Sequence, residues 1–261
     1  MKLSCAWEHN GNDSLLYFTD YPGAYTRGAF LDEALSKVGA ELRAYLRWNG
    51  EPWPGEPGPV IVQEKKSTLR IADADSDLLL DSERPPLTEA EYARLRDLAL
   101  RSARDFHALF RAVPDPEKSA LPARETFYGG RPRTAAEMYA HTKNVNGYYF
   151  GEIGVEIGNE GTIYDCRAEG FARLETVPGF LENPVVSGSY DELWSLRKVL
   201  RRFLWHDRIH AKAMYRMALR TFGPGSVPDV FRFGPTAKKR THRFEHGACV
   251  FWKLSRRGRP S

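Results

Sequence analysis

The 261-residue chain contains no uninterrupted run of about 18 apolar residues, so a membrane-spanning helix is not expected. Its first residues, MKLSCAWEHNGNDSLLYF, lack the basic and then apolar segments of a secretion signal. Cysteine is scarce: the three cysteines lie far apart and form no Cys-x-x-Cys pair, which argues against a disulfide framework and against a cysteine-rich zinc module. These absences predict a protein of the reducing cytoplasm.

The composition is that of an ordinary globular protein, with 42% hydrophobic and 28% charged residues. The net charge of +4 is distributed unevenly: residues 236–261 hold eight basic residues against one acid, a charge of +7, which leaves −3 for the rest of the chain. A mildly acidic body disfavours nucleic-acid binding by the folded part. We expect the C-terminal extension, residues 222–261, to be basic from about residue 236 and disordered there.

The first 65 residues predict a small sheet covered by a helix. Short strands rich in apolar residues are expected at 4–7, 15–19, 25–27 and 59–63. Apolar residues then recur at helical spacing, at Phe30, Ala34, Val38, Leu42 and Tyr45 or Leu46. The segment 50–59 is rich in proline and glycine and is therefore expected to connect this helix to the last strand.

Three segments of this region resemble the HicB-like domain. They are 16–23 (LYFTDYPG), 26–28 (TRG) and 30–35 (FLDEAL), in which a strand enters a Pro-Gly turn and a helix opens with acids in its first turn. The resemblance implies a β-β-β-α-β fold for residues 1–70. HicB-type antitoxins pair with a small toxin, so it also implies a binding or regulatory role as an alternative to catalysis.

Residues 71–86 form an acidic linker. Its acids surround three leucines, at Asp73, Asp75, Asp77, Asp81 and Glu83. Clustered acids suggest calcium, but the glycine and the closing glutamate of an EF-hand loop are missing. We therefore expect an exposed connection that contains one buried strand.

From residue 87 to 221 the pattern predicts four helices. The first begins with the capping box Thr88-Glu-Ala-Glu91 and ends before Pro114, and the second begins after Thr134 and continues to Tyr149 or beyond. A short third helix is expected within 165–181, and the last is expected to run unbroken over 189–220. The fold class is thus α+β, a small sheet domain followed by a four-helix bundle.

Two histidines occupy core positions on the last predicted helix. Its apolar seam consists of Leu196, Val199, Phe203, His206, His210, Ala213 and Met217. The second helix has a similar stripe, formed by Met138, His141, Val145 and Tyr148. Buried imidazoles need partners for their nitrogens, and a divalent cation would satisfy several at once. The pattern favours a metal site of His141, His206 and His210 over ordinary core histidines that bond to carbonyls, waters or acids.

At the segments 140–149 (AHTKNVNGYY) and 205–214 (WHDRIHAKAM), the chain resembles the DinB-like superfamily of metal-binding four-helix bundles. The resemblance implies that His141, His206 and His210 hold one divalent metal ion, which is zinc, nickel, manganese or iron. It also leaves a coordination place for water or substrate. Characterised members include thiol-dependent transferases and isomerases, and many members have no established activity.

These observations predict a metal-dependent hydrolase or thiol transferase that acts on a small molecule, with a low-molecular-weight thiol as a candidate partner. The alternative is a HicB-like regulatory protein, of toxin–antitoxin or nucleic-acid-binding type, with a structural metal. Asp207 either orients a metal ligand or forms a salt bridge on the helix surface, and we favour the salt bridge. Tyr148 and Trp205 are candidates for the pocket wall. No catalytic residue is assigned, and a homodimer stays open.

Overall fold

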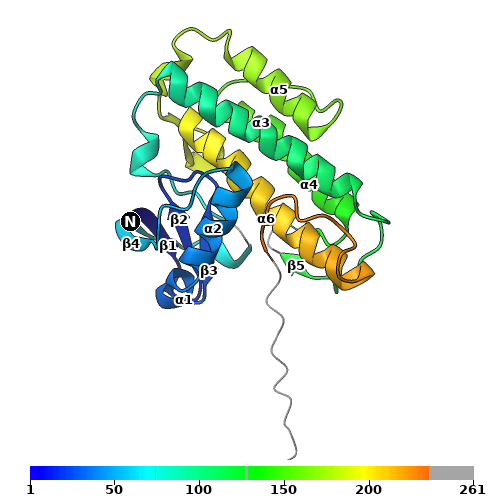
Figure 1. Cartoon of the computed structure of the whole chain (residues 1–261). Helices are drawn as coiled ribbons and strands as arrows, with labels where there is room; N and C mark the ends of the chain where they lie inside the picture. Colours follow the sequence, from blue (N-terminus) through cyan, green and yellow to red (C-terminus); the bar gives the residue numbers. More distant parts are fainter. Residues whose placement is uncertain (74, 127–128, 235–261) are drawn as a thin grey trace, which may run out of the picture.

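The computed structural model describes residues 1–73, 75–126 and 129–234 and shows a mixed α+β protein (Figure 1). A four-stranded sheet comes first and helices follow, so the predicted class is confirmed at this level. The basic segment predicted after residue 236 lies outside the described residues. Within the described part, no helix is both long and apolar enough to cross a membrane.

The N-terminal sheet has the strand order β3-β2-β1-β4. β1 pairs antiparallel with β2 and parallel with β4, so the chain must cross over before β4 is added. This crossover contains α1 (Leu31–Leu35) and α2 (Val38–Asn49). The four strands are β1 (Lys2–His9), β2 (Ser14–Phe18), β3 (Tyr25–Gly28) and β4 (Gly58–Lys66).

The apolar stripe that begins at Phe30 predicted one helix, and this prediction is wrong because the helix is interrupted. α1 ends at Leu35, and the hydroxyl of Ser36 donates a hydrogen bond to the carbonyl of Glu33 at 2.7 Å. A serine that bonds back to the preceding turn competes with helix continuation. α2 therefore starts afresh at Val38 and covers one face of the sheet.

The two faces of the sheet have different coverings because side chains alternate along each strand. Leu16 and Phe18 of β2 pack toward α2. Leu15 and Tyr17 point to the opposite face, where they join leucines of the linker and Trp205 from the last helix. The linker and the last helix therefore close the second face of the sheet.

The linker does not match its prediction as an exposed connection with a buried strand. Between residues 75 and 86 the structure has a 3-10 turn at Asp81–Glu83 and no strand. The leucines 78–80 are nevertheless buried, and the Gln63 side chain of β4 donates to the Leu79 carbonyl at 3.1 Å and accepts from the Asp81 N–H at 3.0 Å. These bonds fasten the linker to the sheet.

Four helices follow the linker and pack against one another, and we call them the bundle. They are α3 (Glu89–Arg111), α4 (Ala135–Gly151), α5 (Ile163–Leu174) and α6 (Leu196–Phe222). α3 begins with the predicted capping box at Thr88, and α4 begins after Thr134 as predicted, with a capping box of its own. Each of these two helices contacts α5, α6 and the other. α6 lies between the other bundle helices and the N-terminal region (Figure 1).

The prediction that the last helix begins at residue 189 is wrong. Tyr190 and Asp191 have φ angles of 59° and 58°, which a right-handed helix does not allow. The chain then pairs β7 (Val186–Ser187) with β8 (Leu193–Trp194), and α6 begins only at Leu196.

Buried contacts join α6 to the N-terminal region. The Glu41 carboxylate of α2 accepts hydrogen bonds from Arg208 at 2.6 Å and from Lys212 at 2.8 Å. Gly23, in the Pro-Gly turn, has a φ of +90° and leaves no room for a side chain, since an added Cβ would lie 2.5 Å from the Cβ of Leu204. The turn that carries the HicB-like resemblance is thus a packing contact with α6.

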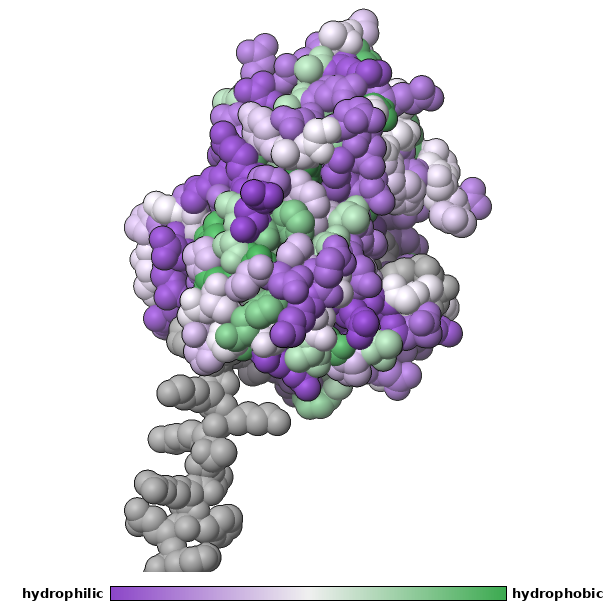
Figure 2. All heavy atoms as spheres, turned by 90° about the vertical axis from the view of Figure 1, so that its right-hand side faces the viewer, coloured by the Kyte–Doolittle hydropathy of each residue, from purple (hydrophilic) through white to green (hydrophobic). Residues whose placement is uncertain are grey.

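Residues 223–234 fold back onto the body, although the predicted C-terminal extension includes them. Val227 and Phe231 are buried, and Phe231 stacks on the Trp48 ring with 5.3 Å between centroids. Elsewhere on the surface, the face shown in Figure 2 has hydrophobic residues in patches among hydrophilic ones. The folded body therefore extends at least to residue 234.

Candidate metal centre

The three predicted histidines come together between α4 and α6. His141, His206 and His210 each offer a ring nitrogen, and these atoms lie within 4.8 Å of one another. The Nε2 atoms of His141 and His206 are 3.2 Å apart. In tetrahedral zinc sites, with Zn–N bonds of about 2.0–2.1 Å, two nitrogen ligands lie about 3.3 Å apart. The set therefore needs only small side-chain rotations to converge on one ion.

Helical spacing places these side chains. His206 and His210 stand one turn apart on α6, with 4.4 Å between ring centroids. His141 faces them from α4, with centroids 5.0 Å from His206 and 4.7 Å from His210. The capping box at Thr134 fixes the start of α4 and so the rotation at which His141 meets α6.

The surroundings keep the three imidazoles neutral. Burial lowers the pKa of His210 to about 3, with further lowering by His141 and Arg131. Burial likewise lowers the pKa of His206 well below its usual value, assisted by the two other histidines and Arg202, and it lowers the pKa of His141. Neutral imidazoles keep the nitrogen lone pair that a metal ion requires.

The site also has the donor chemistry that a metal would use. His206 is 7% exposed, and its Nδ1 has no hydrogen-bond partner among the described residues. No carboxylate of the described chain joins the group, so the donor set is three imidazoles. Zinc, nickel, manganese and iron all accept such ligands, and the residues present fit the implied ion without selecting among these metals.

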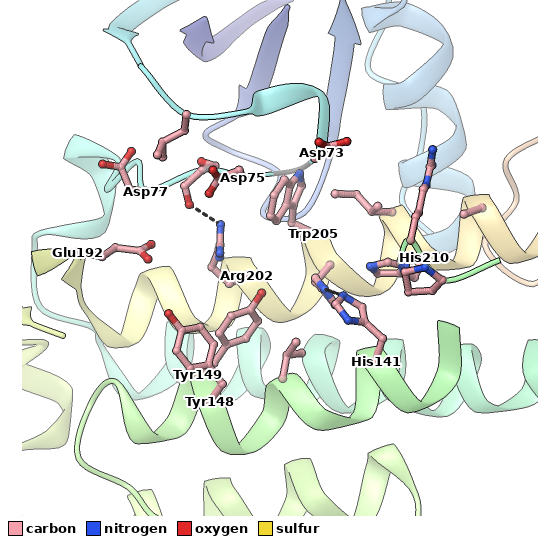
Figure 3. Close-up of a pocket in the computed structure, with 18 of the residues that line it drawn as sticks. Asp73, Asp75, Asp77, His141, Tyr148, Tyr149, Glu192, Arg202, Trp205 and His210 are labelled. Atoms are coloured by element: carbon pink, nitrogen blue, oxygen red, sulfur yellow. Dashed lines mark hydrogen bonds between the residues drawn. The ribbon is translucent and has the colours of Figure 1, made fainter. Parts of the chain in front are cut away.

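The histidines form one end of a pocket of about 570 Å³ (Figure 3). Tyr148 and Tyr149 of α4 and Trp205 of α6 supply aromatic walls. Across from the helices, the linker contributes Asp73, Asp75 and Asp77 to the pocket wall. The pocket therefore lies between the bundle and the N-terminal part of the chain, and both parts build it.

The other predicted site residues have different fates. Tyr148 and Trp205 both line the pocket. Asp207 does not reach the histidines and does not lie on the surface: it is fully buried, and its carboxylate pairs with both terminal nitrogens of Arg167, at 2.6 and 3.0 Å. The favoured interpretation of Asp207 as a salt-bridge partner is therefore confirmed, but its expected place on the helix surface is wrong, because this face of α6 points toward α5 and not toward solvent.

Sequence reasoning missed most of the polar lining. Asp75 and Asp77 belong to the linker, which was assigned to the exterior, and Arg202 and Glu192 were not singled out. For Arg202 a signal existed: it stands four residues before His206, so the two share a face of α6. For the linker acids no local pattern reveals which helix they will face.

Comparisons with models of known protein families, with curated proteins and with solved structures gave no match. The functional argument therefore depends on the residues and on the geometry of the site.

Proposed function

We propose that the chain is a divalent-metal-dependent enzyme of the DinB-like superfamily, preceded by a HicB-like domain, and that it acts on a small molecule. A sheet region followed by bundled helices is the order that both resemblances imply. The observation that carries the proposal is the convergence of His141, His206 and His210 at the end of a pocket of about 570 Å³.

In this proposal the three imidazoles hold a zinc, nickel, manganese or iron ion. When bound, such an ion lowers the pKa of water or stabilises a thiolate for attack on an electrophile. The chain's own contribution is to keep the three histidines neutral and mutually oriented. Tyr148, Tyr149 and Trp205 exclude water from one wall of the pocket and pack against apolar parts of a substrate.

A hydrolase with an activated water and a transferase with a small thiol both fit this arrangement. A HicB-like regulatory protein with a structural metal is the alternative. Structural sites are closed by four protein ligands, whereas the described residues supply three, next to a pocket that a substrate can enter. This difference favours the enzymatic role.

The proposal is tested by the metal content of purified protein after dialysis against each of the four metals. We expect one equivalent per chain in the wild type and a large loss in His206→Ala and His210→Ala. His9→Gln is the matched control, because His9 lies on β1 and pairs with Glu64 at 3.0 Å. Stoichiometric binding that persists in His206→Ala, or no binding of any of these metals by the wild type, would contradict the metal site.

The catalytic part of the proposal needs its own test. Chelation should abolish turnover of ester and thiol-acceptor substrates, and restoring the metal should bring it back. If chelation lowers only the melting temperature and no metal-dependent turnover exists, the structural-metal alternative is correct.

A further inference from the structure

One buried cation at the pocket lacks the carboxylate partner that its neighbours have. Four other buried cations on α5 and α6 are ion-paired, as Lys198–Glu192, Arg201–Glu83, Arg208–Glu41 and Arg167–Asp207. Arg202 is 8% exposed, and no carboxylate in the described ranges lies within ion-pair distance of it. Arg202 is therefore the exception on a helix that otherwise neutralises its buried charges.

The contacts of Arg202 do not compensate for this missing partner. Its Nη1 donates to the Ser76 carbonyl at 2.9 Å, while its buried Nε has no acceptor among the described residues. The guanidinium carbon lies 4.9 Å from the ring centroid of Trp205, 5.4 Å from that of Tyr149 and 5.7 Å from that of Trp194. These rings limit the access of water, and the charge has only more distant acids, Glu192 and Asp75, to offset its desolvation. A ligand carboxylate in direct contact would offset more of that cost.

The position of Arg202 joins it to the metal centre. It lines the same pocket as the histidines and precedes His206 by one helical turn, about 6 Å along the axis of α6. Figure 3 shows its guanidinium extending from α6 toward the linker, with Tyr149 and Trp205 nearby and the histidines farther along the helix. A small molecule can therefore contact both places at once.

The charges of the pocket wall favour an anion. Most of the acids already have cationic partners in the pairs Asp73–Arg124, Asp77–Lys65 and Glu192–Lys198, and Arg27 is paired with Asp13. Among the described lining residues this leaves Asp75 against Arg131 and Arg202. The lining itself holds three arginines and four acids, and with the partners of the ion pairs counted the balance is one positive charge. A divalent ion on neutral histidines would make it more positive.

We propose that the substrate of this site carries a carboxylate, and that Arg202 binds this group while the other end of the molecule reaches the three histidines. The planar guanidinium suits a carboxylate because it offers paired N–H donors, and such bonds are strong where water is excluded. The inference rests on the proposed function only for the metal-bound end. Arg202 is thus a specificity-determining residue.

The test uses cobalt-loaded protein, because binding of a thiolate to cobalt changes the absorption spectrum. Mercaptoacetate, 3-mercaptopropionate and 4-mercaptobutyrate are titrated against mercaptoalcohols of the same chain lengths. In the wild type we expect the best acid to bind about tenfold more tightly than its alcohol, or better. Arg202→Gln should remove this preference without changing the affinity for the alcohols. Arg216→Gln, which alters an exposed arginine of the same helix, should keep it.

Acids that bind no better than alcohols, or a preference that survives in Arg202→Gln, would overturn the inference. If Arg202→Gln fails to fold, Arg202→Lys replaces it and should retain only part of the preference, because an ammonium offers no planar pair of donors. If the protein takes up no cobalt, the metal proposal fails separately. Succinate and succinamide are then titrated into metal-free protein, with tryptophan fluorescence as the readout. Binding of succinate alone, dependent on Arg202, supports the inference, and equal or absent binding refutes it.

Discussion

The two sides of α6 differ in whether their buried charged groups have a carboxylate partner. On the side toward the N-terminal region, Arg208 and Lys212 share the Glu41 carboxylate, at 2.6 and 2.8 Å. On the side toward the pocket, the described residues provide no partner for the Nδ1 atom of His206 and no carboxylate within ion-pair distance of Arg202. One helix thus carries both a neutralised interface and a set of groups that lack partners.

The difference separates assembly from function. Polar groups that join two parts of a protein are stabilising only when their partners are in place, and Glu41 provides this partner for α6. Groups left without partners cost free energy, and a ligand can offset that cost when it binds. The pocket lies where the N-terminal region meets the bundle, and the linker that lines it is held to α6 by Lys198 and Arg201, which donate to the carbonyls of Asp77 and Leu78.

Glu41→Gln tests the assembly side and has the largest expected effect. The neutral amide would leave Arg208 and Lys212 without their counter-ion, which for buried pairs costs about 3–5 kcal/mol. We expect this loss in the free energy of unfolding by urea. Glu33→Gln, which alters an exposed pair with Lys37, is the control and should change stability little. An equal effect of both substitutions would show that the Glu41 contact is not special.

The pH dependence of stability should reveal the same contact. Burial raises the pKa of Glu41, but Lys212 and Arg208 overcome that effect and hold it at about 2, below the ordinary 4.5. The stabilisation is therefore complete above pH 4.5, where the unfolded chain is also ionised, and it is lost as the pH falls toward 2. A shift of this size corresponds to about 3 kcal/mol.

Acid unfolding of the wild type and of Glu41→Gln provides the measurement. Histidines with lowered pKa values also destabilise the folded protein in acid, but they do so in both proteins and cancel in the difference. The difference in stability between the two proteins should shrink as the pH falls below 4.5. A difference that stays constant down to pH 2 would contradict the assigned role of Glu41.

The pocket side should also respond to metal. A ligand that binds only the folded state at a hundredfold excess over its Kd stabilises a protein by about 2.7 kcal/mol. We expect zinc to raise the free energy of unfolding by this amount in the wild type and in His9→Gln, and not in His206→Ala. An equal rise in His206→Ala would place the zinc elsewhere on the chain.

The sequence predicted those features that depend on local periodicity. Short apolar segments between turn residues indicated the strands, and a capping box and a cap residue, Thr134, located the starts of α3 and α4. The interval of four between His206 and His210 placed both rings on one face. The sequence also indicated that His141 would approach His206 and His210, because it lies on the apolar stripe by which α4 faces the bundle core.

Features that depend on distant contacts were not predictable in this way. Asp207 lies one residue from a histidine, yet its partner is Arg167 on α5, and no spacing connects the two. The linker acids line the pocket only because Gln63 and buried leucines hold the linker against the sheet. Arg202 stands out only once the partners of every other buried cation are known.

The start of α6 was predicted wrongly, and a substitution at its true start has the smallest expected effect on stability. The acids that follow Ser189 suggested a helix start there, but positive φ angles interrupt the chain, and the Ser195 hydroxyl accepts the N–H of Lys198 instead. Loss of an N-cap costs about 1 kcal/mol. Because this hydroxyl also donates to the Glu83 carbonyl at 2.9 Å, Ser195→Ala should lower the free energy of unfolding by at least this amount, while Ser189→Ala should leave it unchanged. Because Ser195 fixes the rotation of the helix that carries both the paired and the unpaired groups, Ser195→Ala should also weaken metal binding slightly. If Ser189→Ala lowered the free energy of unfolding more than Ser195→Ala, the helix would begin near residue 189, as the sequence predicted.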